Sequence, residues 1–319
     1  MTWLDDGAVT RLRAAATWPE LEGDRYTVLA EIGRGGMGTV YLARDEALGR
    51  EVALKVSNAL ASEERERRIR TEARILARLE HPGIVPIHDV GRLVDGRLFY
   101  VMKRVRGETL LAHLVSRRAL GERLGIFERI CDPVAFAHAQ GCIHRDLKPE
   151  NIMIGDFGEV MVMDWGVAKT GDADGEAGTI LGTPGYMSPE QASGAGGRVD
   201  ARTDVYGLGA ILFTLLTGEA PPGDPESAAL RIRDRQYGVP RLLQAICARA
   251  LARDPAHRYA SVGALAAELA RYRSGQAVDA HPETIVDRAL RFAVTYRTPI
   301  LLVLAYMLMR AIVAYVAGR

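Results

Sequence analysis

The sequence predicts an α+β protein of two lobes, a small mainly-β lobe with one helix followed by a large mainly-α lobe. Strand-like runs dominate residues 26–101, whereas apolar residues recur at helical spacing over residues 108–141 and 208–216. The length of 319 residues leaves room for both lobes around a sizeable core. A nearly continuous apolar stretch near the C-terminus predicts, in addition, a transmembrane helix over residues 298–317.

The composition is that of a folded protein without a bulk charge. Apolar residues make up 48% of the chain, and 41 basic residues balance 40 acidic ones to a net charge of +1, so we expect no nucleic-acid partner. Cys131, Cys142 and Cys247 are too few for a disulfide framework and lack Cys-x-x-Cys spacing, which indicates reduced thiols in the cytosol. Asp5 and Asp6 interrupt the N-terminus, which therefore does not resemble a signal peptide.

Changes of pattern along the chain suggest its division into parts. The predicted parts are an N-terminal leader over residues 1–25, a two-lobed domain over residues 26–273, a juxtamembrane linker over residues 274–297 and the apolar helix over residues 298–317. Within the two-lobed domain, the small lobe covers residues 26–101, a hinge covers residues 102–106 and the large lobe covers residues 107–273.

Three glycines separate the first two predicted strands. Gly33, Gly35 and Gly38 lie between the strand-like runs Tyr26–Leu29 and Thr39–Ala43. A dinucleotide-binding fold would need a helix after the glycines instead of a second strand. Glycines let a tight hairpin lie close over phosphates and donate backbone N–H groups, although this spacing alone fits an ordinary turn equally well.

Lys55 lies inside the apolar strand Glu51–Val56, where an unpaired ammonium group would be costly. It therefore needs an anion, unless the strand is at an edge and the amino group reaches solvent. Residues 62–79 follow with apolar side chains at three- and four-residue spacing, which predicts a helix with Glu72 near its apolar stripe.

The next predicted elements lead into the large lobe. Ile84–His88 and Leu98–Met102 predict two more strands, and an apolar helix around Phe127–Ala139 precedes the most polar motif of the chain. After that motif, Ile152–Ile154 and Val160–Met163 predict a hairpin.

The polar motif covers residues 144–151 and combines an acid, a cation and a carboxamide. Asp146 could accept a proton from a hydroxyl, Lys148 could neutralise charge on a phosphoryl group, and Asn151 offers a neutral oxygen to Mg²⁺. Phosphoryl transfer needs this equipment, because its catalysis is mostly positioning and charge stabilisation. The alternative is a polar turn ahead of the hairpin.

These motifs, in this order, resemble the bacterial-type, eukaryotic-like serine/threonine protein kinases over about residues 26–273. Residues 144–151 resemble the catalytic loop of that family, including the Lys-Pro-Glu of its serine/threonine branch. The glycines from Gly33 to Gly38 resemble its glycine-rich loop, and Lys55 resembles the strand lysine that contacts the α- and β-phosphates. The resemblance implies the bilobal protein kinase fold, with ATP and Mg²⁺ (or Mn²⁺) as cofactors.

The resemblance also implies a set of ATP-binding residues. Glu72 would hold Lys55 in place, with Glu64 and Glu66 as rivals, and the backbone of Lys103 and Val105 would hold adenine. An acidic residue often stands in the family where Lys103 stands here, but a backbone contact tolerates this departure. The full set is Ile32, Gly33, Gly35, Gly36, Gly38, Val40, Ala53, Lys55, Glu72, Met102, Lys103 and Val105.

Two aspartates compete for the role of metal ligand beside Asn151. Asp156 begins an Asp-Phe-Gly run, the spelling of the family's metal motif, but it follows Asn151 too closely for the hairpin to fit between them. Asp164 follows the hairpin, so we assign the Mg²⁺-binding aspartate to Asp164 and a turn position to Asp156. Trp165 replaces the usual phenylalanine and is expected to keep the same apolar contact.

The stretch after Asp164 resembles an activation segment. Arg145 would pair with a phosphate on this segment, with Thr179 as the first candidate phosphosite and Thr170 as the second. Thr183 would hydrogen-bond within the catalytic site. A rigid, constitutively active segment is the alternative.

Three further residues are expected to have structural roles. By resemblance, Arg258 would form a buried pair with Glu190 that locks the large lobe. Asp204 would cap its helix and brace the catalytic loop. The short stretch 219–240 replaces a longer helical insertion of the family, which leaves substrate docking there in doubt.

The function expected from the resemblance is transfer of the ATP γ-phosphoryl group to serine or threonine hydroxyls of proteins, with autophosphorylation of the activation segment, for which a homodimer would serve. A catalytically weak nucleotide-binding scaffold is the main rival. A small-molecule kinase is a third reading, which the peptide-positioning run Gly182–Glu190 disfavours.

The tail is expected to anchor the domain to a membrane with its two lobes in the cytoplasm. Basic residues before the apolar stretch fit the positive-inside rule. Arg310 interrupts the stretch and would cost about 2.5–3.5 kcal/mol at the bilayer centre, less if its side chain snorkels. The alternative is a helix that packs on the domain or on a partner.

Overall fold

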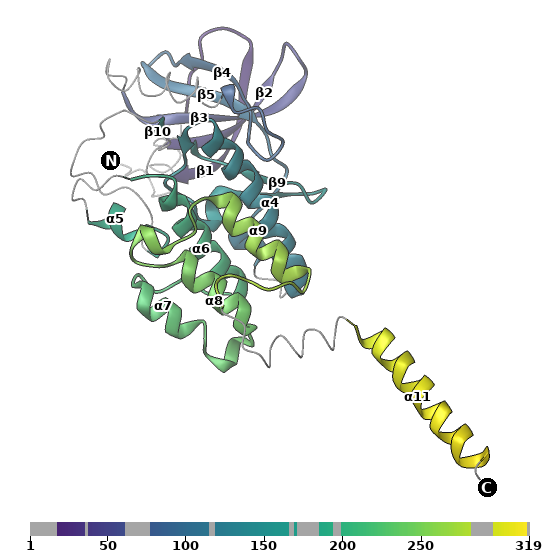
Figure 1. The fold of residues 1–319 in the computed structure, drawn as a ribbon. Helices are drawn as coiled ribbons and strands as arrows, with labels where there is room; N and C mark the ends of the chain where they lie inside the picture. The colour runs from purple at the N-terminus through teal and green to yellow at the C-terminus, as the bar shows by residue number, and fades with distance from the viewer. Residues whose placement is uncertain are drawn as a thin grey trace, which may run out of the picture.

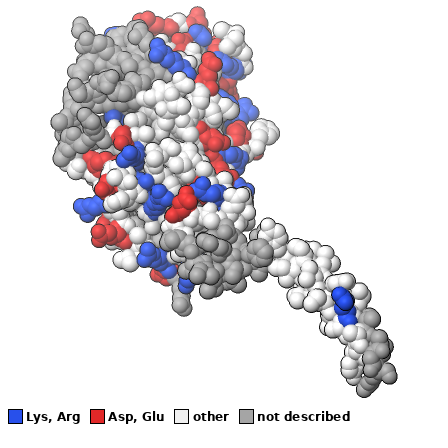
Figure 2. Space-filling model, in the orientation of Figure 1, with Lys and Arg blue, Asp and Glu red and all other residues white. Residues whose placement is uncertain are grey.

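The protein has a sheet-containing lobe, a helical lobe and a separate C-terminal helix (Figure 1). The computed structural model describes residues 18–35, 38–60, 77–114, 119–165, 169–170, 185–193, 199–281 and 296–317. Figure 2 shows positive and negative side chains interspersed over the visible face of both lobes.

The small lobe is a five-stranded antiparallel sheet in the order β1-β2-β3-β5-β4. Its strands are β1 (Tyr26–Gly35), β2 (Gly38–Asp45), β3 (Arg50–Leu60), β4 (Ile87–Arg92) and β5 (Arg97–Lys103).

Alternation along β3 assigns its side chains to two faces. Val52, Leu54 and Val56 pack into a core on one face of the sheet. Ala53 joins a second cluster on the opposite face, the face on which Lys55 also lies.

The structure corrects one prediction for the small lobe and leaves another mostly untested. The strand predicted over Ile84–His88 is wrong in its bounds, because Pro86 cannot donate to a ladder and β4 begins at Ile87. The helix predicted over residues 62–79 lies mostly outside the described residues. Of this range the structure describes residues 77–79, and residues 77 and 78 are helical.

Part of the predicted leader packs on the small lobe. Leu21 pairs with Leu93, and the Trp18 ring meets the Tyr41 ring edge-on at a centroid distance of 5.6 Å.

The large lobe is mainly helical. Its helices are α3 (Leu110–His113), α4 (Leu120–Ala139), α5 (Pro189–Ala192), α6 (Arg202–Thr217), α7 (Pro225–Arg231), α8 (Arg241–Ala250) and α9 (Val262–Arg273), with short 3₁₀ turns at Pro149–Asn151, Arg235–Tyr237 and Pro255–His257.

The large lobe also contains short strands. They are β6 (Gly107–Thr109), β7 (Cys142–Ile143), β8 (Ile152–Gly155), β9 (Val160–Val162) and β10 (Lys169–Thr170), in the orders β6-β8-β9 and β10-β7. The hairpin β8–β9 has Asp156 in its turn and leaves the Phe157 side chain 98% exposed.

The lobe continues past Arg273, where the sequence places the start of the linker. The chain turns back along α9, the side chain of Val278 is buried in the core, and the Ala280 N–H donates to Glu268 Oε1 at 2.7 Å. Residues 276–281 therefore form a strap on the large lobe.

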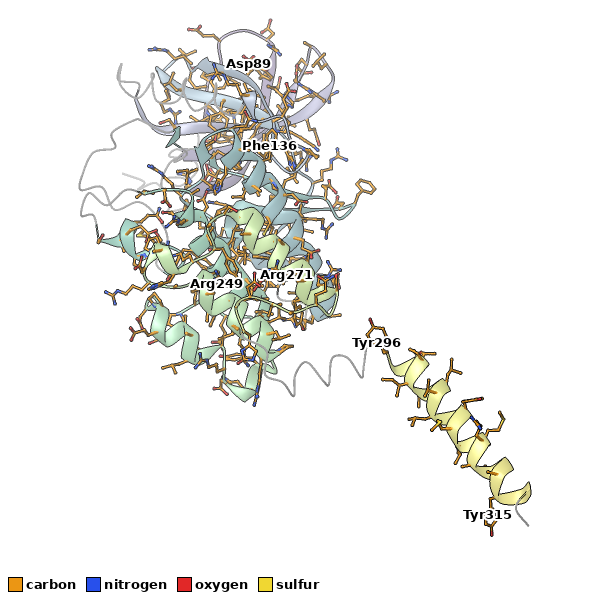
Figure 3. All side chains as sticks on the ribbon, in the orientation of Figure 1. Asp89, Phe136, Arg249, Arg271, Tyr296 and Tyr315 are labelled. Atoms are coloured by element: carbon orange, nitrogen blue, oxygen red, sulfur yellow. The ribbon has the colours of Figure 1, made fainter. Side chains whose placement is uncertain are left out.

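The helix α11 (Arg297–Ala317) extends away from the helical lobe, with Tyr296 and Tyr315 at its two ends (Figure 3). Its apolar side chains are exposed, for example Leu301, Leu304 and Ile312. No helix in the described part of the chain is long and apolar enough to cross a membrane, so the transmembrane helix predicted over residues 298–317 is not confirmed.

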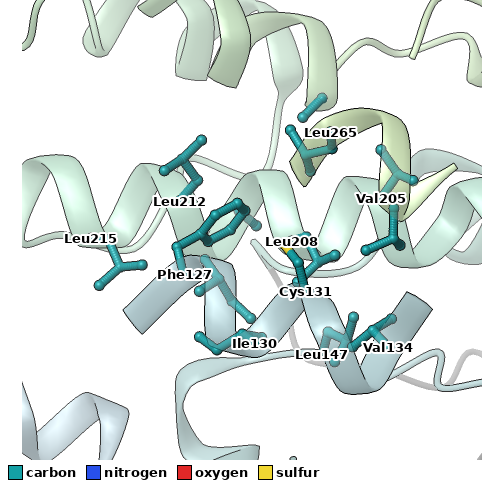
Figure 4. Close-up of a cluster of buried hydrophobic side chains, with 14 of the residues drawn as sticks. Phe127, Ile130, Cys131, Val134, Leu147, Val205, Leu208, Leu212, Leu215 and Leu265 are labelled. Carbon is teal, nitrogen blue, oxygen red and sulfur yellow. The ribbon is translucent and has the colours of Figure 1, made fainter. Parts of the chain in front are cut away.

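The core of the large lobe is built around α6, which is buried on nearly all sides. Phe127, Ile130 and Val134 of α4 belong to the same buried cluster as Leu208 and Leu212 of α6 (Figure 4). A helix that is apolar all round belongs at the centre of a lobe. Its first turn carries Asp204 to the catalytic loop, so this core positions the site.

Candidate active site

The candidate site lies where the second face of the sheet meets the hairpin β8–β9. Ala53, Tyr100 and Met102 of the small lobe form one buried cluster with Met161 of β9. Partly buried Val40, Val105 and Met163 pack against the same cluster. The structure thus brings the predicted residues Val40, Ala53, Met102 and Val105 together. Sequence reasoning missed Met161 and Met163, although the alternation of the β9 run could have indicated them.

The glycine-rich hairpin borders this cluster. Gly33 pairs with Val40, and Gly35 pairs with Gly38 where the hairpin closes, whereas Gly36 lies outside the described residues. Ile32, on β1, is half exposed. A Cβ on Gly38 would lie 2.4 Å from the Val56 carbonyl oxygen, so this position requires glycine.

The hinge is tied to both lobes, and on the side of the large lobe the Asp156 N–H donates to the Arg106 carbonyl at 3.0 Å. The Lys103 N–H donates to the Pro86 carbonyl at 3.1 Å, so this N–H is already engaged and cannot make the predicted backbone contact with adenine. Arg106 Nη2 lies 3.0 Å from Glu51 Oε2 of β3, and Arg104 contacts the same carboxylate. Sequence reasoning missed these ion pairs, because nothing local signals them.

Lys55 forms an ion pair with Asp164 in which Nζ contacts Oδ1. The Lys55 side chain is mostly buried, and its Nζ lies 5.8 Å from the centre of the Tyr100 ring. The predicted partner Glu72 lies outside the described residues, so this structure does not test that pair. Asp164 has a left-handed backbone, with φ of 61°.

The catalytic loop brings together Asp146, Lys148 and Asn151. Lys148 Nζ lies 2.9 Å from Asp146 Oδ2. Asn151 Nδ2 donates to the Asp146 carbonyl at 2.8 Å and to Asp146 Oδ2 at 3.1 Å, which leaves its amide oxygen for another partner. The arrangement places a carboxylate, an ammonium group and a carboxamide side by side on one loop.

His144 joins the catalytic loop to the segment that carries Asp164. Its buried ring contacts the Met163 carbonyl through Nε2 at 2.9 Å and accepts the Asp146 N–H through Nδ1 at 3.3 Å. The ring lies 4.6 Å from that of Trp165, which is buried and donates to the Val162 carbonyl at 3.2 Å.

Asp204 braces the catalytic loop from α6. Its Oδ2 accepts the His144 N–H at 2.8 Å and meets His138 Nε2 at 2.7 Å, and its Oδ1 accepts the Arg145 N–H at 2.8 Å. Burial alone would raise the pKa of this carboxyl, but the hydrogen bonds and nearby histidines hold the pKa below its ordinary value. The predicted capping role is wrong, because the carboxylate faces the loop and α6 has no side-chain cap.

Arg145 has a left-handed backbone, with φ of 71°, directly before Asp146. Its guanidinium is half buried, and burial lowers its pKa. Arg145 Nε is buried without a hydrogen-bond partner in the described structure.

Glu190 and Arg258 form a two-pronged ion pair, with both N···O distances at 2.7 Å. Burial would raise the pKa of Glu190, but the bonds from Arg258 and Thr203 lower it. This pair joins the end of the activation segment to the far side of the large lobe.

The candidate phosphosites are mostly outside the described structure. The Thr170 backbone pairs with Cys142 between β10 and β7. Thr179 and Thr183 lie outside the described residues.

The donor set fits Mg²⁺ by its chemistry. Asp164 offers carboxylate oxygens and Asn151 an amide oxygen, which are hard ligands. Mg²⁺ typically takes one or two carboxylates together with substrate phosphates, so the small number of protein ligands is not an obstacle.

A comparison with protein families matches residues 26–268 to the protein kinase domain. The chain belongs to the protein kinase family. This confirms the fold class expected for the two lobes.

Curated relatives of this kinase-family chain are bacterial. It is 39% identical to the serine/threonine-protein kinase PknB of Mycolicibacterium smegmatis over 292 residues, which cover 85% of this chain and 46% of the relative. It is 33% identical to the serine/threonine-protein kinase PknD of Chlamydia caviae over 321 residues, covering 87% of this chain and 34% of the relative. The chain therefore spans less than half the length of these relatives. The resemblance to bacterial-type serine/threonine protein kinases is confirmed.

Proposed function

We propose that this kinase-family chain transfers the γ-phosphoryl group of ATP to serine or threonine hydroxyls of proteins. The observation that carries the proposal is the meeting of Asp146, Lys148 and Asn151 on one loop, across from the Lys55–Asp164 pair. The serine/threonine-protein kinases PknB and PknD, to which the chain is similar, support the choice of acceptor.

Each residue has a role in the proposed reaction. Asp146 orients the acceptor hydroxyl and receives its proton as the new O–P bond forms and the bond to the ADP oxygen breaks. Lys148 stabilises the phosphoryl group in transfer, and Lys55 holds the phosphates under the glycine hairpin. Asn151 and Asp164 would hold Mg²⁺, which neutralises phosphate charge when bound.

The test is Asp146→Asn in the full chain. Asparagine keeps the size of the side chain but cannot take the proton, so we expect a loss of transfer of about 10²–10⁴-fold. ATP affinity, measured by calorimetry, stays within about twofold because Asp146 lies outside the proposed nucleotide contacts. Transfer at the wild-type rate, measured with γ-labelled ATP and a generic protein acceptor, would show that the role is misassigned.

A catalytically weak nucleotide-binding scaffold is the second candidate. The direct Lys55–Asp164 pair favours it, because that pair engages two groups that Mg-ATP would need. Calorimetry and the transfer assay with γ-labelled ATP distinguish the kinase from the scaffold. A wild-type chain that binds ATP but transfers no phosphate supports the scaffold.

We also propose that the activation segment is autophosphorylated in a homodimer. The unpartnered Arg145 Nε and half-buried guanidinium support a phosphate partner on Thr179 or Thr170. Mass spectrometry after incubation with Mg-ATP tests the sites. Mixing an Asp146→Asn chain with a tagged wild type tests transfer between copies.

Finally, we propose that α11 associates with a membrane and keeps the lobes in the cytoplasm, where ATP is available. The exposed apolar side chains of α11 support this, as do Tyr296 and Tyr315 at its ends, because tyrosines favour membrane interfaces. Flotation with phospholipid vesicles tests association, and carbonate extraction separates an inserted anchor from a helix on the surface. A full chain that stays at the bottom of the gradient would contradict the proposal.

A further inference from the structure

Gln191 connects the end of the activation segment to the catalytic loop. Its Oε1 accepts the Ser188 N–H at 3.1 Å and the Ser188 O–H at 3.0 Å. Its Nε2 donates in the opposite direction, to the Arg145 carbonyl, at 2.8 Å. One amide group thus bridges two segments 46 residues apart in the chain.

The peptide groups around Arg145 are held from both sides. A left-handed backbone costs a non-glycine residue about 1–3 kcal/mol, so it persists only where surrounding contacts fix it. Asp204 of α6 accepts the N–H of Arg145 at 2.8 Å, and Gln191 of α5 donates to its carbonyl at 2.8 Å. That carbonyl belongs to the peptide bond leading to Asp146, so the hydrogen bond from Gln191 limits rotation of the backbone that carries the reacting carboxylate.

Glutamine is chemically specific for this position. The bridge needs an acceptor toward Ser188, which is fully buried, and a donor toward a carbonyl. Glutamate has the same shape and keeps the acceptor, but its second oxygen would face the Arg145 carbonyl oxygen without a hydrogen between them. Methionine has a similar length and supplies neither group.

We infer that Gln191 is a positioning residue, which couples the segment ending the activation region to the orientation of Asp146. The inference rests on the proposed phosphoryl transfer, and it adds a residue that neither the motif of residues 144–151 nor the family match assigns. Its effect belongs on the chemical step, because the hydrogen bonds of Gln191 within the described structure reach Ser188 and Arg145 and do not reach Lys55 or the apolar cluster under the glycine hairpin.

The test compares Gln191→Glu with Gln244→Glu in the full chain. Gln244 lies in α8, away from the site, and its Nε2 donates to the Val239 carbonyl at 2.8 Å. This hydrogen bond matches the one from Gln191 to Arg145 in kind and in length. We expect Gln191→Glu to lower kcat about tenfold, equivalent to about 1.4 kcal/mol, with KM for ATP within about twofold. Gln244→Glu should leave kcat within about twofold.

Hydrogen exchange gives a readout that does not need activity. In Gln191→Glu, peptides covering residues 144–147 should exchange faster than in the wild type, whereas those of Gln244→Glu should not. If the wild type transfers phosphate, equal kcat values in both variants, or a loss confined to KM for ATP, overturn the inference. If the wild type does not transfer phosphate, the proposed function fails, and unchanged exchange at residues 144–147 then overturns the positioning role as well.

Discussion

At the residue scale, strain gathers beside the reacting groups. Arg145 and Asp164 are the non-glycine residues with left-handed backbone in the described structure. One immediately precedes the proposed base, and the other is the proposed metal ligand. Long-range contacts hold both, from Asp204 and Gln191 to Arg145 and from Lys55 to Asp164. Such conformations persist where the surroundings over-determine them.

Asp204→Asn should destabilise the protein by about 3 kcal/mol at pH 7, because an amide presents a donor to groups that are themselves donors. The folded-state pKa of Asp204 is depressed, so the stability it contributes is present above the unfolded pKa of about 3.9 and is lost as pH falls through the folded value. The difference in unfolding free energy between wild type and variant should therefore narrow below about pH 4.

Urea unfolding of both chains at pH 7, 5 and 3.5 checks this expectation. A constant difference across the series would mean that the pKa of Asp204 is the same in the folded and unfolded states, which would contradict the expectation. Measured kcat at pH 7 should also fall, since Asp204 holds the N–H groups of His144 and Arg145.

Local pattern predicted the residues of the site better than their partners. Asp146, Lys148 and Asn151 belong to one short motif, so their proximity follows from sequence spacing. The Lys55–Asp164 contact joins residues 109 apart and has no local signal. Asp204 was expected both to cap and to brace, and only the geometry of α6 against the loop separates these two roles.

At the element scale, the close approach of α6 and α8 depends on Gly209. A Cβ there would lie 2.8 Å from the Ala250 Cβ and 3.1 Å from its carbonyl carbon. Helix propensity favours alanine over glycine by about 1 kcal/mol, but overpacking costs about 1–3 kcal/mol.

We expect Gly209→Ala to lower the free energy of unfolding by about 1–2 kcal/mol, because neighbouring backbone must shift. Gly125→Ala is the matched control: it lies inside α4 with no atom within 4 Å of the added Cβ, and it should stabilise by up to about 1 kcal/mol. Thermal unfolding monitored by circular dichroism compares the two. If both variants shift the midpoint of thermal unfolding by the same amount and in the same direction, the packing argument is contradicted.

Element existence was more predictable than element bounds. Strand-like apolar runs separated by glycines predicted β1, β2, β3 and β5, and apolar residues at helical spacing predicted α4 and α6. The strand predicted from Ile84 begins at Ile87, and Ile84 forms an isolated bridge with Val162 of the large lobe. Such a contact between distant segments leaves no periodic trace in the sequence.

At the scale of the whole molecule, polar contacts join the two lobes directly and also tie the small lobe to the hinge. The Val162 N–H donates to the Gly83 carbonyl of the small lobe at 2.8 Å, and Glu51 of β3 contacts Arg104 and Arg106 of the hinge. The large lobe is in turn closed by the strap of residues 276–281. Its polar composition resembles that of a linker, which is why the sequence placed the domain boundary at residue 273.

The strap predicts where the chain can be shortened. A chain ending at Arg273 loses the buried Val278 side chain, worth about 1.5 kcal/mol, and the Ala280 N–H that bonds the fully buried Glu268, worth about 1.5–3 kcal/mol. Its midpoint of thermal unfolding should fall by roughly 6–18 °C relative to a chain ending at His281, at about 2–4 °C per kcal/mol. Differential scanning calorimetry of the two chains makes the comparison. Because Glu268 keeps its contact with Arg271 in both, the difference isolates the strap, and identical midpoints would show that residues 274–281 behave as linker after all.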